Sequence, residues 1–235
     1  MHRFRQLREA NDLHLDYTLN ADGLSILDAI FRLREYADYF PFYEDATIVD
    51  VGAHYGYFSL FAAANLGPQG SVYAIEPSPA SFAILRNNLR DNKADNVLPH
   101  ELALAGRSDK QQLYLGRAEN NSLLEDYELL DGSGAKTEVK ALTLEDFMTE
   151  QNIEFIDFLK LDCEGAEYDI LETASEEVLS RVTTISLEFH DLKSAEHKGA
   201  SIVRLLGEHG YRIVKFTHEP TMRNLNYGKI VATRD

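Results

Sequence analysis

Acidic side chains and a histidine lie at the ends of two β-rich segments in the second half of the chain. Asp162 and Glu164 follow the segment 155–161, and Glu188 and His190 follow the segment 183–187. Side chains alternate along a strand, so Glu188 and His190 should share one face. Buried acids placed together are unfavourable unless protons, hydrogen bonds or a cation compensate. We therefore predict that this cluster carries chemistry.

The cluster suits the removal of a proton from a substrate hydroxyl. His190 can act as the general base near neutral pH, because an unperturbed imidazole has a pKa of about 6.5. Alternatively, Asp162 and Glu188 could hold Mg²⁺, a cation that prefers oxygen ligands and acidifies a bound hydroxyl. Both a metal-free base, either His190 or a carboxylate, and a metal therefore stay open. The structural alternatives are that Asp162, Glu164 and Glu167 are helix-start acids and that His190 is a satisfied core histidine.

A glycine-containing turn follows the first β-rich segment, 47–51. Gly52 and Gly56 lie four residues apart in this turn. Glycine lets a ligand approach the backbone, although it could also serve only tight strand–helix packing. The third glycine of a dinucleotide fingerprint is missing, which disfavours a nicotinamide-dependent oxidoreductase. Glu76, after the segment 71–75, stands where a carboxylate accepts hydrogen bonds from ribose hydroxyls. Together these features favour S-adenosylmethionine, a nucleoside ligand without phosphates.

Strand-like and helix-like segments alternate along the chain, which indicates how these residues are positioned. Strands are predicted at 47–51, 71–75, 155–161 and 183–187, and helices at 57–66, 78–92, 166–179 and 194–209. This alternation predicts an α/β fold with a doubly wound, mostly parallel sheet and right-handed crossovers. The segments 211–216 and 229–233 are predicted to pair as an antiparallel C-terminal edge. Ligands of such sheets bind beyond the carboxyl ends of the strands, where the clusters described above lie.

The length of 235 residues favours one main domain. We place this domain at 46–235 and a helical cap at 1–45, on the substrate side of the sheet. Within the cap, 24–37 has amphipathic helical spacing and 36–43 is rich in aromatic residues. The segment 117–136 lacks periodicity and is a candidate lid.

Composition excludes several classes of partner. The chain has 23 Lys and Arg against 39 Asp and Glu, a net charge of −16, so neither nucleic acid nor an anionic membrane surface is expected to bind. The longest apolar stretch, 57–66, is far shorter than the roughly 20 residues of a bilayer span. The first residues lack the apolar core of a secretory signal, and the single Cys163 cannot form an internal disulfide. We expect a soluble, cytoplasmic protein that acts on a small molecule, and we make no prediction of its oligomeric state.

Three motifs, at 50–59, 74–79 and 158–167, resemble those of the FkbM family of S-adenosylmethionine-dependent methyltransferases. They occur in the family's order, and the resemblance extends from about residue 46 to the C-terminus. It implies the Rossmann-like class I methyltransferase fold. In that fold, seven strands stand in the order third, second, first, fourth, fifth, seventh, sixth. It also implies O-methylation, commonly of sugar or polyketide-type hydroxyls.

The resemblance further implies which positions contact the cofactor. The turn after the first strand would surround the methionine end, Glu76 would hold the ribose, and the backbone of Ala103 would contact adenine. His54 stands where the family usually has Asn, and Glu101 is the acid nearest to the position just before Ala103, where the family usually has one. The expected cofactor-binding residues are Asp50, Gly52, Ala53, His54, Gly56, Tyr57, Glu76, Pro77, Glu101, Ala103 and Asp162.

The sequence thus predicts S-adenosylmethionine-dependent O-methylation of a hydroxyl on a small polyhydroxylated acceptor. Asp162, Glu188 and His190 are the predicted catalytic residues, and Asp162 and Glu188 are the predicted ligands of any Mg²⁺. Two alternatives stay open. One is an N-methyltransferase. The other is a binding protein that keeps the nucleoside site without turnover, which the departures at His54 and before Ala103 favour.

Overall fold

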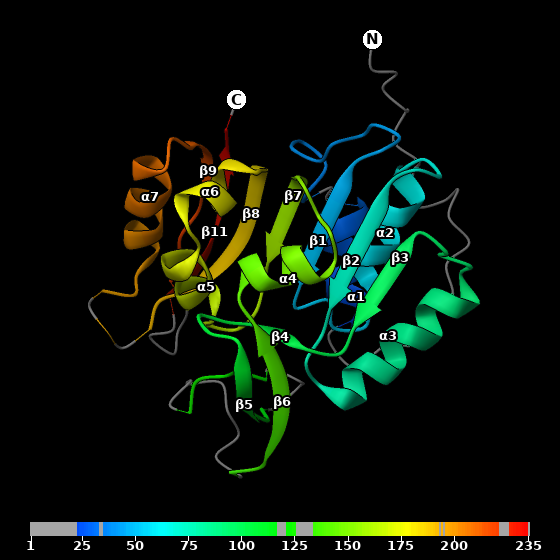
Figure 1. The fold of residues 1–235 in the computed structure, drawn as a ribbon, viewed down its shortest axis with the longest axis horizontal. Helices are drawn as coiled ribbons and strands as arrows, with labels where there is room; N and C mark the ends of the chain where they lie inside the picture. Colours follow the sequence, from blue (N-terminus) through cyan, green and yellow to red (C-terminus); the bar gives the residue numbers. More distant parts are fainter. Residues whose placement is uncertain are drawn as a thin grey trace.

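The computed structural model describes residues 23–32, 35–116, 121–125, 134–192, 194, 196–220 and 226–234. The main sheet has eight strands in the order β10-β11-β8-β7-β1-β2-β3, and β9 pairs with β11 (Figure 1). The neighbouring strands β3, β2, β1, β7 and β8 are parallel, whereas β11 is antiparallel to both β8 and β9. Their bounds are β1 (Thr47–Val51), β2 (Ser71–Ile75), β3 (Val97–His100), β7 (Ile156–Leu161), β8 (Val182–His190), β9 (Arg212–Phe216), β10 (Glu219–Pro220) and β11 (Asn226–Thr233).

The observed topology confirms the predicted α/β fold with its antiparallel C-terminal edge. Apart from the short β10, the strands of the main sheet stand in the order β3-β2-β1-β7-β8-β11-β9. This is the order that the family resemblance implies. The boundaries of β1 and β2 agree with the prediction. β8 is longer than predicted and extends to His190, because its last residues pair with β11 through Tyr227 and Gly228.

Helices cover both faces of the main sheet, and alternating side chains supply the two cores. Ile48 of β1 packs with α1 (Gly23–Leu27), η2 (Asp28–Arg32, a π-helix), α2 (Tyr57–Asn65) and α3 (Pro79–Asp91). Val49 and Val51 face the opposite core, with α4 (Leu144–Glu150), α5 (Glu167–Thr173), α6 (Glu176–Ser180) and α7 (Gly199–Glu208). Successive side chains of β1 therefore point into the two cores in turn, as expected for a strand that is buried on both faces.

Three predicted helices are wrong in extent. The helix predicted at 194–209 is observed as α7, which begins only at Gly199 and ends at Glu208. The segment 166–179 forms two helices, because Ala174 is extended and Ser175 caps α6 by accepting a hydrogen bond from the Val178 N–H at 3.2 Å. A Ser followed by two acids is a helix-start signal that the prediction passed over. In the described part of the predicted helix 24–37, helical structure ends at Arg32 and a turn follows from Glu35.

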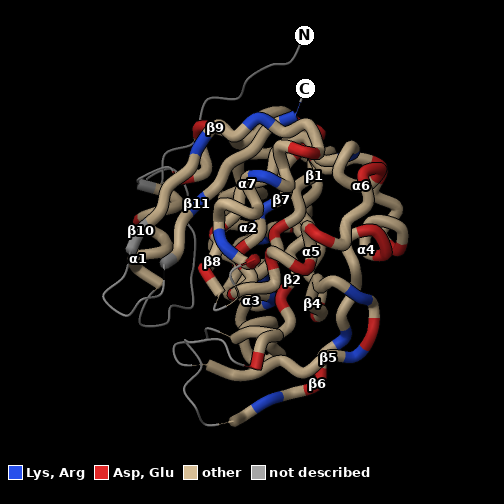
Figure 2. Tube along the Cα trace, turned by 90° about the vertical axis from the view of Figure 1, so that its left-hand side faces the viewer, with Lys and Arg blue, Asp and Glu red and all other residues tan. Residues whose placement is uncertain are grey.

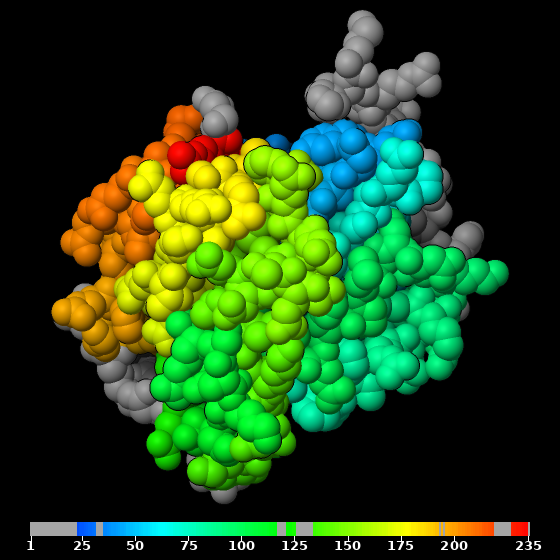
Figure 3. All heavy atoms as spheres, viewed as in Figure 1, coloured from blue at the N-terminus to red at the C-terminus, as the bar shows by residue number. Residues whose placement is uncertain are grey.

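A second, three-stranded sheet was not predicted. It consists of β4 (Ala103–Leu104), β5 (Asp109–Tyr114) and β6 (Lys136–Leu142) in the order β4-β6-β5. It follows the carboxyl end of β3 and protrudes from the body of the molecule (Figures 1 and 3). Most residues of β5 and β6 are polar, and Leu113 is the one buried residue of β5, so these strands give no strong apolar signal. The predicted lid 117–136 lies largely outside the described residues.

The described part of the N-terminal segment packs on the face covered by α2. The Phe40 ring lies 5.4 Å from that of Phe61 and 5.6 Å from that of Phe158, centroid to centroid. The aromatic stretch 36–43 therefore contributes to the core. The proposed division at residue 46 stays a prediction, and residues 1–22 lie outside the described part.

Acidic residues dominate the charged surface. Figure 2 shows Asp and Glu on α4 and α6, where Glu145, Asp146, Glu176 and Glu177 occupy the first helical turns. Carboxylates at helix starts interact favourably with the helix dipole. Among the described residues, no helix is both long and apolar enough to cross a membrane.

Candidate functional site

A cavity of about 390 Å³ lies beyond the carboxyl ends of β1, β2, β7 and β8. It is enclosed on one side by α1, η2 and the turn that follows them. Parallel α/β sheets bind ligands at this edge. The residues that line the cavity are Ser25, Ile26, Ala29, Ile30, Glu35, Tyr36, Val51, Gly52, Ala53, His54, Tyr57, Phe58, Ile75, Glu76, Pro77, Ala103, Leu104, Leu113, Asn121, Leu123, Lys160, Asp162, Cys163, Glu164, Ala166, Glu188 and Lys229.

The turn after β1 forms one wall of the cavity. The N–H groups of Gly52 and Ala53 both donate to the Ile75 carbonyl, at 3.0 and 2.9 Å, which ties the turn to β2. Gly52 has φ +75°, and a Cβ there would lie 1.8 Å from the Asp162 carbonyl oxygen. Gly56 has φ +85°, and its Cβ would lie 2.5 Å from a methyl carbon of Leu85. Both glycines therefore allow close packing of the turn, which is the structural alternative to a role in ligand approach. Of the two, only Gly52 also lines the cavity.

The Glu76 carboxylate is held in the cavity wall by the backbone. His54 N–H donates to Oε2 and Ser78 N–H to Oε1, both at 2.8 Å. Burial raises the pKa of Glu76 to about 7, although these two hydrogen bonds favour the ionised form. Each carboxylate oxygen can accept a second hydrogen bond. Glu76 is thus a buried, backbone-anchored acceptor with capacity left for hydroxyl donors from a ligand.

A buried lysine links the ends of β1 and β7. The Lys160 Nζ lies 3.1 Å from Asp50 Oδ1 and 3.6 Å from Asp162 Oδ2, and it donates to the Gly52 carbonyl at 3.4 Å. The side chains of Lys160 and Asp50 are 6% and 0% exposed, and Asp162 is 35% exposed. Burial opposes the ammonium charge, but the two carboxylates outweigh it and raise the pKa of Lys160. Asp50 therefore supports the site from behind, while Asp162 opens into the cavity.

Glu188 opens into the cavity from β8. Burial and the neighbouring acids Asp162 and Glu164 raise the pKa of Glu188 to about 9. Glu188 Oε2 lies 3.4 Å from the Nζ of Lys229, on the neighbouring strand β11. Lys229 also forms an ion pair with Glu35. Burial lowers the pKa of Lys229 to about 8.

His190 shares a face with Glu188, as predicted, but the structure places it behind the cavity wall. Its Nε2 lies 3.5 Å from Glu164 Oε2 and 3.6 Å from Glu188 Oε1, two carboxylates that do line the cavity. Its Nδ1 lies 4.0 Å from Glu167 Oε1. His190 can therefore act on a ligand only through Glu164 or Glu188.

Glu167 has a structural role in this region. It is fully buried, and its two oxygens accept from the N–H groups of Cys163 and Gly165, each at 2.9 Å. These bonds hold the turn after β7, in which Glu164 and Gly165 both have positive φ. The helix-start alternative considered for Glu167 matches this geometry.

The structure brings most of the predicted cofactor-binding residues together. Lining positions are Gly52, Ala53, His54, Tyr57, Glu76, Pro77, Ala103 and Asp162. Asp50 and Gly56 lie behind the wall, and Glu101 is exposed and does not line the cavity.

Lys160, Lys229, Glu35 and Tyr36 line the cavity but were not predicted as site residues. Lys160 lies within a family motif, where a lysine inside an otherwise apolar strand is a signal of a buried charge partner. The remaining three carry no such signal, because only tertiary structure brings them to the cavity.

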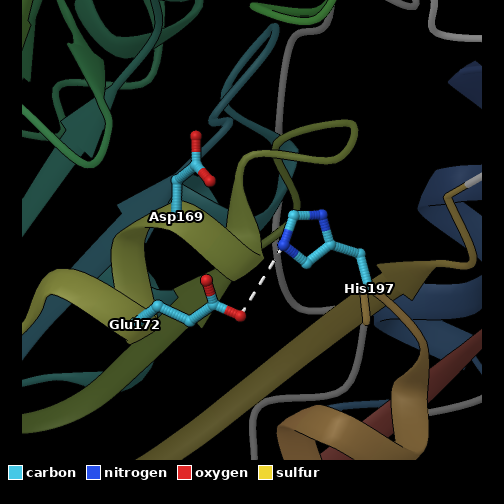
Figure 4. Close-up of side chains that lie close together, drawn as sticks. All are labelled: Asp169, Glu172 and His197. Atoms are coloured by element: carbon cyan, nitrogen blue, oxygen red, sulfur yellow. Dashed lines mark ion pairs between the residues drawn. The ribbon is translucent and has the colours of Figure 1, made fainter. Parts of the chain in front are cut away.

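The geometry does not fit a metal at Asp162 and Glu188. The ammonium groups of Lys160 and Lys229 lie within 3.6 Å of these two carboxylates, where they supply positive charge. Within the described part of the chain, three possible metal ligands converge instead on the surface, at Asp169, Glu172 and His197 (Figure 4). There His197 Nε2 lies 3.7 Å from Glu172 Oε1, an ordinary ion-pair contact outside the cavity.

Comparisons with known proteins identify the family of this chain. A family model for the methyltransferase FkbM domain matches residues 50–213. The chain is 29% identical over 201 residues to Methyltransferase 1 of Beauveria bassiana, covering 76% of this chain and 80% of that protein. It is 27% identical over 213 residues to the 31-O-demethyl-FK506 methyltransferase FkbM of Streptomyces tacrolimicus, covering 80% of each.

A solved structure shares the fold. The N-terminal domain of EvdMO1, whose crystal structure was determined in the presence of SAH and D-fucose, superimposes with a TM-score of 0.52 at 13% identity. The match covers 87% of this chain and 82% of that one.

Proposed function

Because the chain belongs to the FkbM methyltransferase family, we propose that the cavity binds S-adenosylmethionine beside a hydroxyl acceptor and that the enzyme catalyses O-methylation. The observation that carries this proposal is the placement of Glu76. This carboxylate is anchored by two backbone N–H groups at the carboxyl end of β2, and it faces the same cavity as the turn after β1. A ribose with two free hydroxyls matches such an acceptor.

The residues present fit the cofactor. Five acids line the cavity against two lysines, and these acids are Glu35, Glu76, Asp162, Glu164 and Glu188. Even with Glu188 protonated at neutral pH, as its pKa of about 9 implies, the other acids outnumber the two lysines, which favours a ligand that carries a sulfonium and an ammonium group. In the proposed arrangement, Glu76 holds the ribose, the turn 52–54 lies along the methionine end, and Ala103 lies beside the adenine. When bound, S-adenosylmethionine supplies an activated methyl group.

The protein's own contribution is positioning and proton removal without a metal. Lys160 fixes Asp162 at the cavity wall through its ion pair, so Asp162 can orient the cofactor or the acceptor. Glu188 is the group that we assign to accept the hydroxyl proton, because its raised pKa makes its ionised form a stronger base than an ordinary carboxylate. His190 lies behind Glu188 and Glu164 and contacts both carboxylates from outside the cavity.

The test combines cofactor binding with turnover. Calorimetry should show that S-adenosylmethionine binds the wild type, and Glu76→Ala should weaken this binding by about tenfold or more, the effect of losing hydrogen bonds to a charged group. Glu101→Ala is the matched control, because this predicted cofactor residue is an exposed acid outside the cavity. Equal affinities in the two variants would contradict the assignment of the ribose site.

Turnover distinguishes the rival functions. Mass spectrometry after incubation with S-adenosylmethionine should detect methyl ethers formed from hydroxyl acceptors, for which D-fucose and myo-inositol are suitable first probes. Methylation of ethanolamine at nitrogen would instead indicate an N-methyltransferase. Cofactor binding with no transfer to any acceptor would indicate a non-catalytic binding protein.

A further inference from the structure

Two groups of a lysine and two carboxylates flank the cavity, and they differ in exposure. In the first, Asp50, Lys160 and Asp162, the lysine side chain is only 6% exposed. In the second, which consists of Glu35, Lys229 and Glu188 and is here called the Lys229 group, the side chains are 13%, 30% and 25% exposed. All three members of the Lys229 group line the cavity. All three residues therefore border the space that a ligand would occupy, although Glu35 Oε1, the oxygen that faces Lys229, is itself buried.

Three separate parts of the chain build the Lys229 group. Lys229 of β11 lies opposite Glu188 of β8 in the strand register, and its Nζ is 3.4 Å from Glu188 Oε2. Glu35 reaches the same ammonium from the turn that follows η2. The proposed ribose site lies at the end of β2. Along the sheet, β1 and β7 separate β2 from β8 and β11, so the Lys229 group lies at the opposite end of the cavity. This is the end that a methyl acceptor would occupy.

We propose that Glu35 and Lys229 bind the acceptor together with Glu188 and select a neutral compound with two neighbouring hydroxyl groups. This inference rests on the proposed O-methyltransferase function. An ammonium only donates hydrogen bonds and a carboxylate only accepts them, whereas a hydroxyl does both. A hydroxyl can therefore insert between Lys229 and either carboxylate without leaving a polar group unsatisfied.

In this arrangement the two hydroxyls have different fates. The first accepts from Lys229 and gives its proton to Glu188 while its oxygen bonds to the methyl carbon. The carbon–sulfur bond breaks, and its electron pair stays on sulfur, which becomes a neutral thioether. The second hydroxyl accepts from Lys229, donates to Glu35 and is not methylated. An ammonium acceptor could not accept from Lys229, and a carboxylate could not donate to Glu35, so both are disfavoured.

The experiment compares acceptors and variants of the full-length protein. The acceptors are cis-1,2-cyclohexanediol, 1,4-cyclohexanediol, cyclohexanol, D-fucose and ethanolamine. The variants are Lys229→Met, Lys229→Arg and Glu35→Gln. Lys110→Met is the control, because Lys110 pairs with Glu138 on the exposed face of the small sheet. Calorimetry gives the affinity for S-adenosylmethionine, and thermal unfolding verifies that each variant is folded.

The wild type should prefer the two compounds with neighbouring hydroxyls. Lys229→Met should lower kcat/KM for these acceptors by about ten- to hundredfold, the effect of losing one hydrogen bond to a charged group. Glu35→Gln should lower it by about tenfold, because the amide oxygen still accepts a hydrogen bond but more weakly than a carboxylate. Cofactor affinity should stay within about twofold of the wild-type value. Lys229→Arg should recover part of the loss, because guanidinium keeps both the charge and the donors.

A second readout does not depend on turnover. In the SAH-loaded wild type, saturating D-fucose should slow the acetylation of Lys229 by acetic anhydride, measured by peptide mass spectrometry, and leave that of Lys110 unchanged. Glu35→Gln should reduce this protection.

Three outcomes would overturn the inference. The first is an unchanged kcat/KM in folded Lys229→Met, and the second is equal turnover of the diols and cyclohexanol. The third is a wild type that binds S-adenosylmethionine but neither turns over any hydroxyl compound nor shows protection of Lys229. Failure of the wild type to bind S-adenosylmethionine would instead contradict the proposed function itself. The two failures are therefore distinguishable.

Discussion

Lys160→Met tests whether the buried lysine holds the site together. The substitution keeps most of the side-chain volume but removes the ammonium that lies 3.1 Å from Asp50 Oδ1. Asp50 is fully buried, and its other oxygen already accepts from the Ser59 hydroxyl at 2.6 Å. The variant therefore leaves a carboxylate in the interior without its counter-ion.

The expected loss of stability is large. Removing one partner of a buried ion pair costs about 3–5 kcal/mol, because the remaining charge is desolvated and uncompensated. For a chain of this size, that loss corresponds to a decrease in Tm of about 6–20 °C. The additional substitution Asp50→Asn should restore part of the stability, because it removes the orphaned charge. The single variant should also bind S-adenosylmethionine more weakly, since Asp162 loses the contact that fixes it.

The assay is urea denaturation monitored by circular dichroism. It compares the wild type, Lys160→Met, Asp50→Asn and the double variant. Lys110→Met is the matched control, because the Lys110–Glu138 pair is exposed and should contribute no measurable stability. A loss below about 1 kcal/mol in Lys160→Met, or a double variant less stable than Lys160→Met, would refute the reasoning.

The remaining predictions concern the cavity wall. The pKa of about 7 for Glu76 lies above its ordinary value, so the carboxylate is mostly protonated at pH 6 and mostly ionised at pH 8. Affinity for S-adenosylmethionine should therefore rise about tenfold between these values, and calorimetry should find no such rise in Glu76→Gln. The pKa values of about 9 for Glu188 and about 8 for Lys229 imply that kcat/KM rises to a maximum between pH 8 and 9 and falls above it, because the base must be ionised while the ammonium keeps its proton. Glu188→Gln should lower kcat by about 10²–10⁴-fold with little change in cofactor affinity, and a flat pH–rate profile in the wild type would argue against this role. Gly52→Ala should unfold at a markedly lower temperature in a thermal scan, because its Cβ would overlap the Asp162 carbonyl. A wild-type Tm in this variant would show that the turn can shift at little cost.

The main sheet was predictable from local sequence patterns. The strands at 47–51 and 71–75 are short β-rich runs bounded by turn residues, and the structure confirms their ends. The small sheet was not predictable in the same way, because β5 buries only Leu113 and gives no apolar period. The break at Ala174 was missed because helical periodicity continues across the Ser175 cap.

The site was predictable where it depends on strand ends. Parallel strands bring Gly52, Glu76 and Asp162 to one edge of the sheet, and all three line the cavity. Strand alternation also placed His190 on the face of Glu188, but it could not show that Glu164 and Glu188 separate this histidine from the cavity. Lys229 and Glu35 depend on contacts between distant parts of the chain, which no local pattern reports.

The central claim is that an adenosyl ligand occupies the cavity with its ribose on Glu76. A crystal structure of the protein with bound S-adenosylhomocysteine tests it most directly. Both ribose hydroxyls should lie within hydrogen-bond distance of the Glu76 carboxylate, with the sulfur directed toward Glu188. A ribose bound elsewhere, or a cavity that stays closed at saturating ligand, would contradict it.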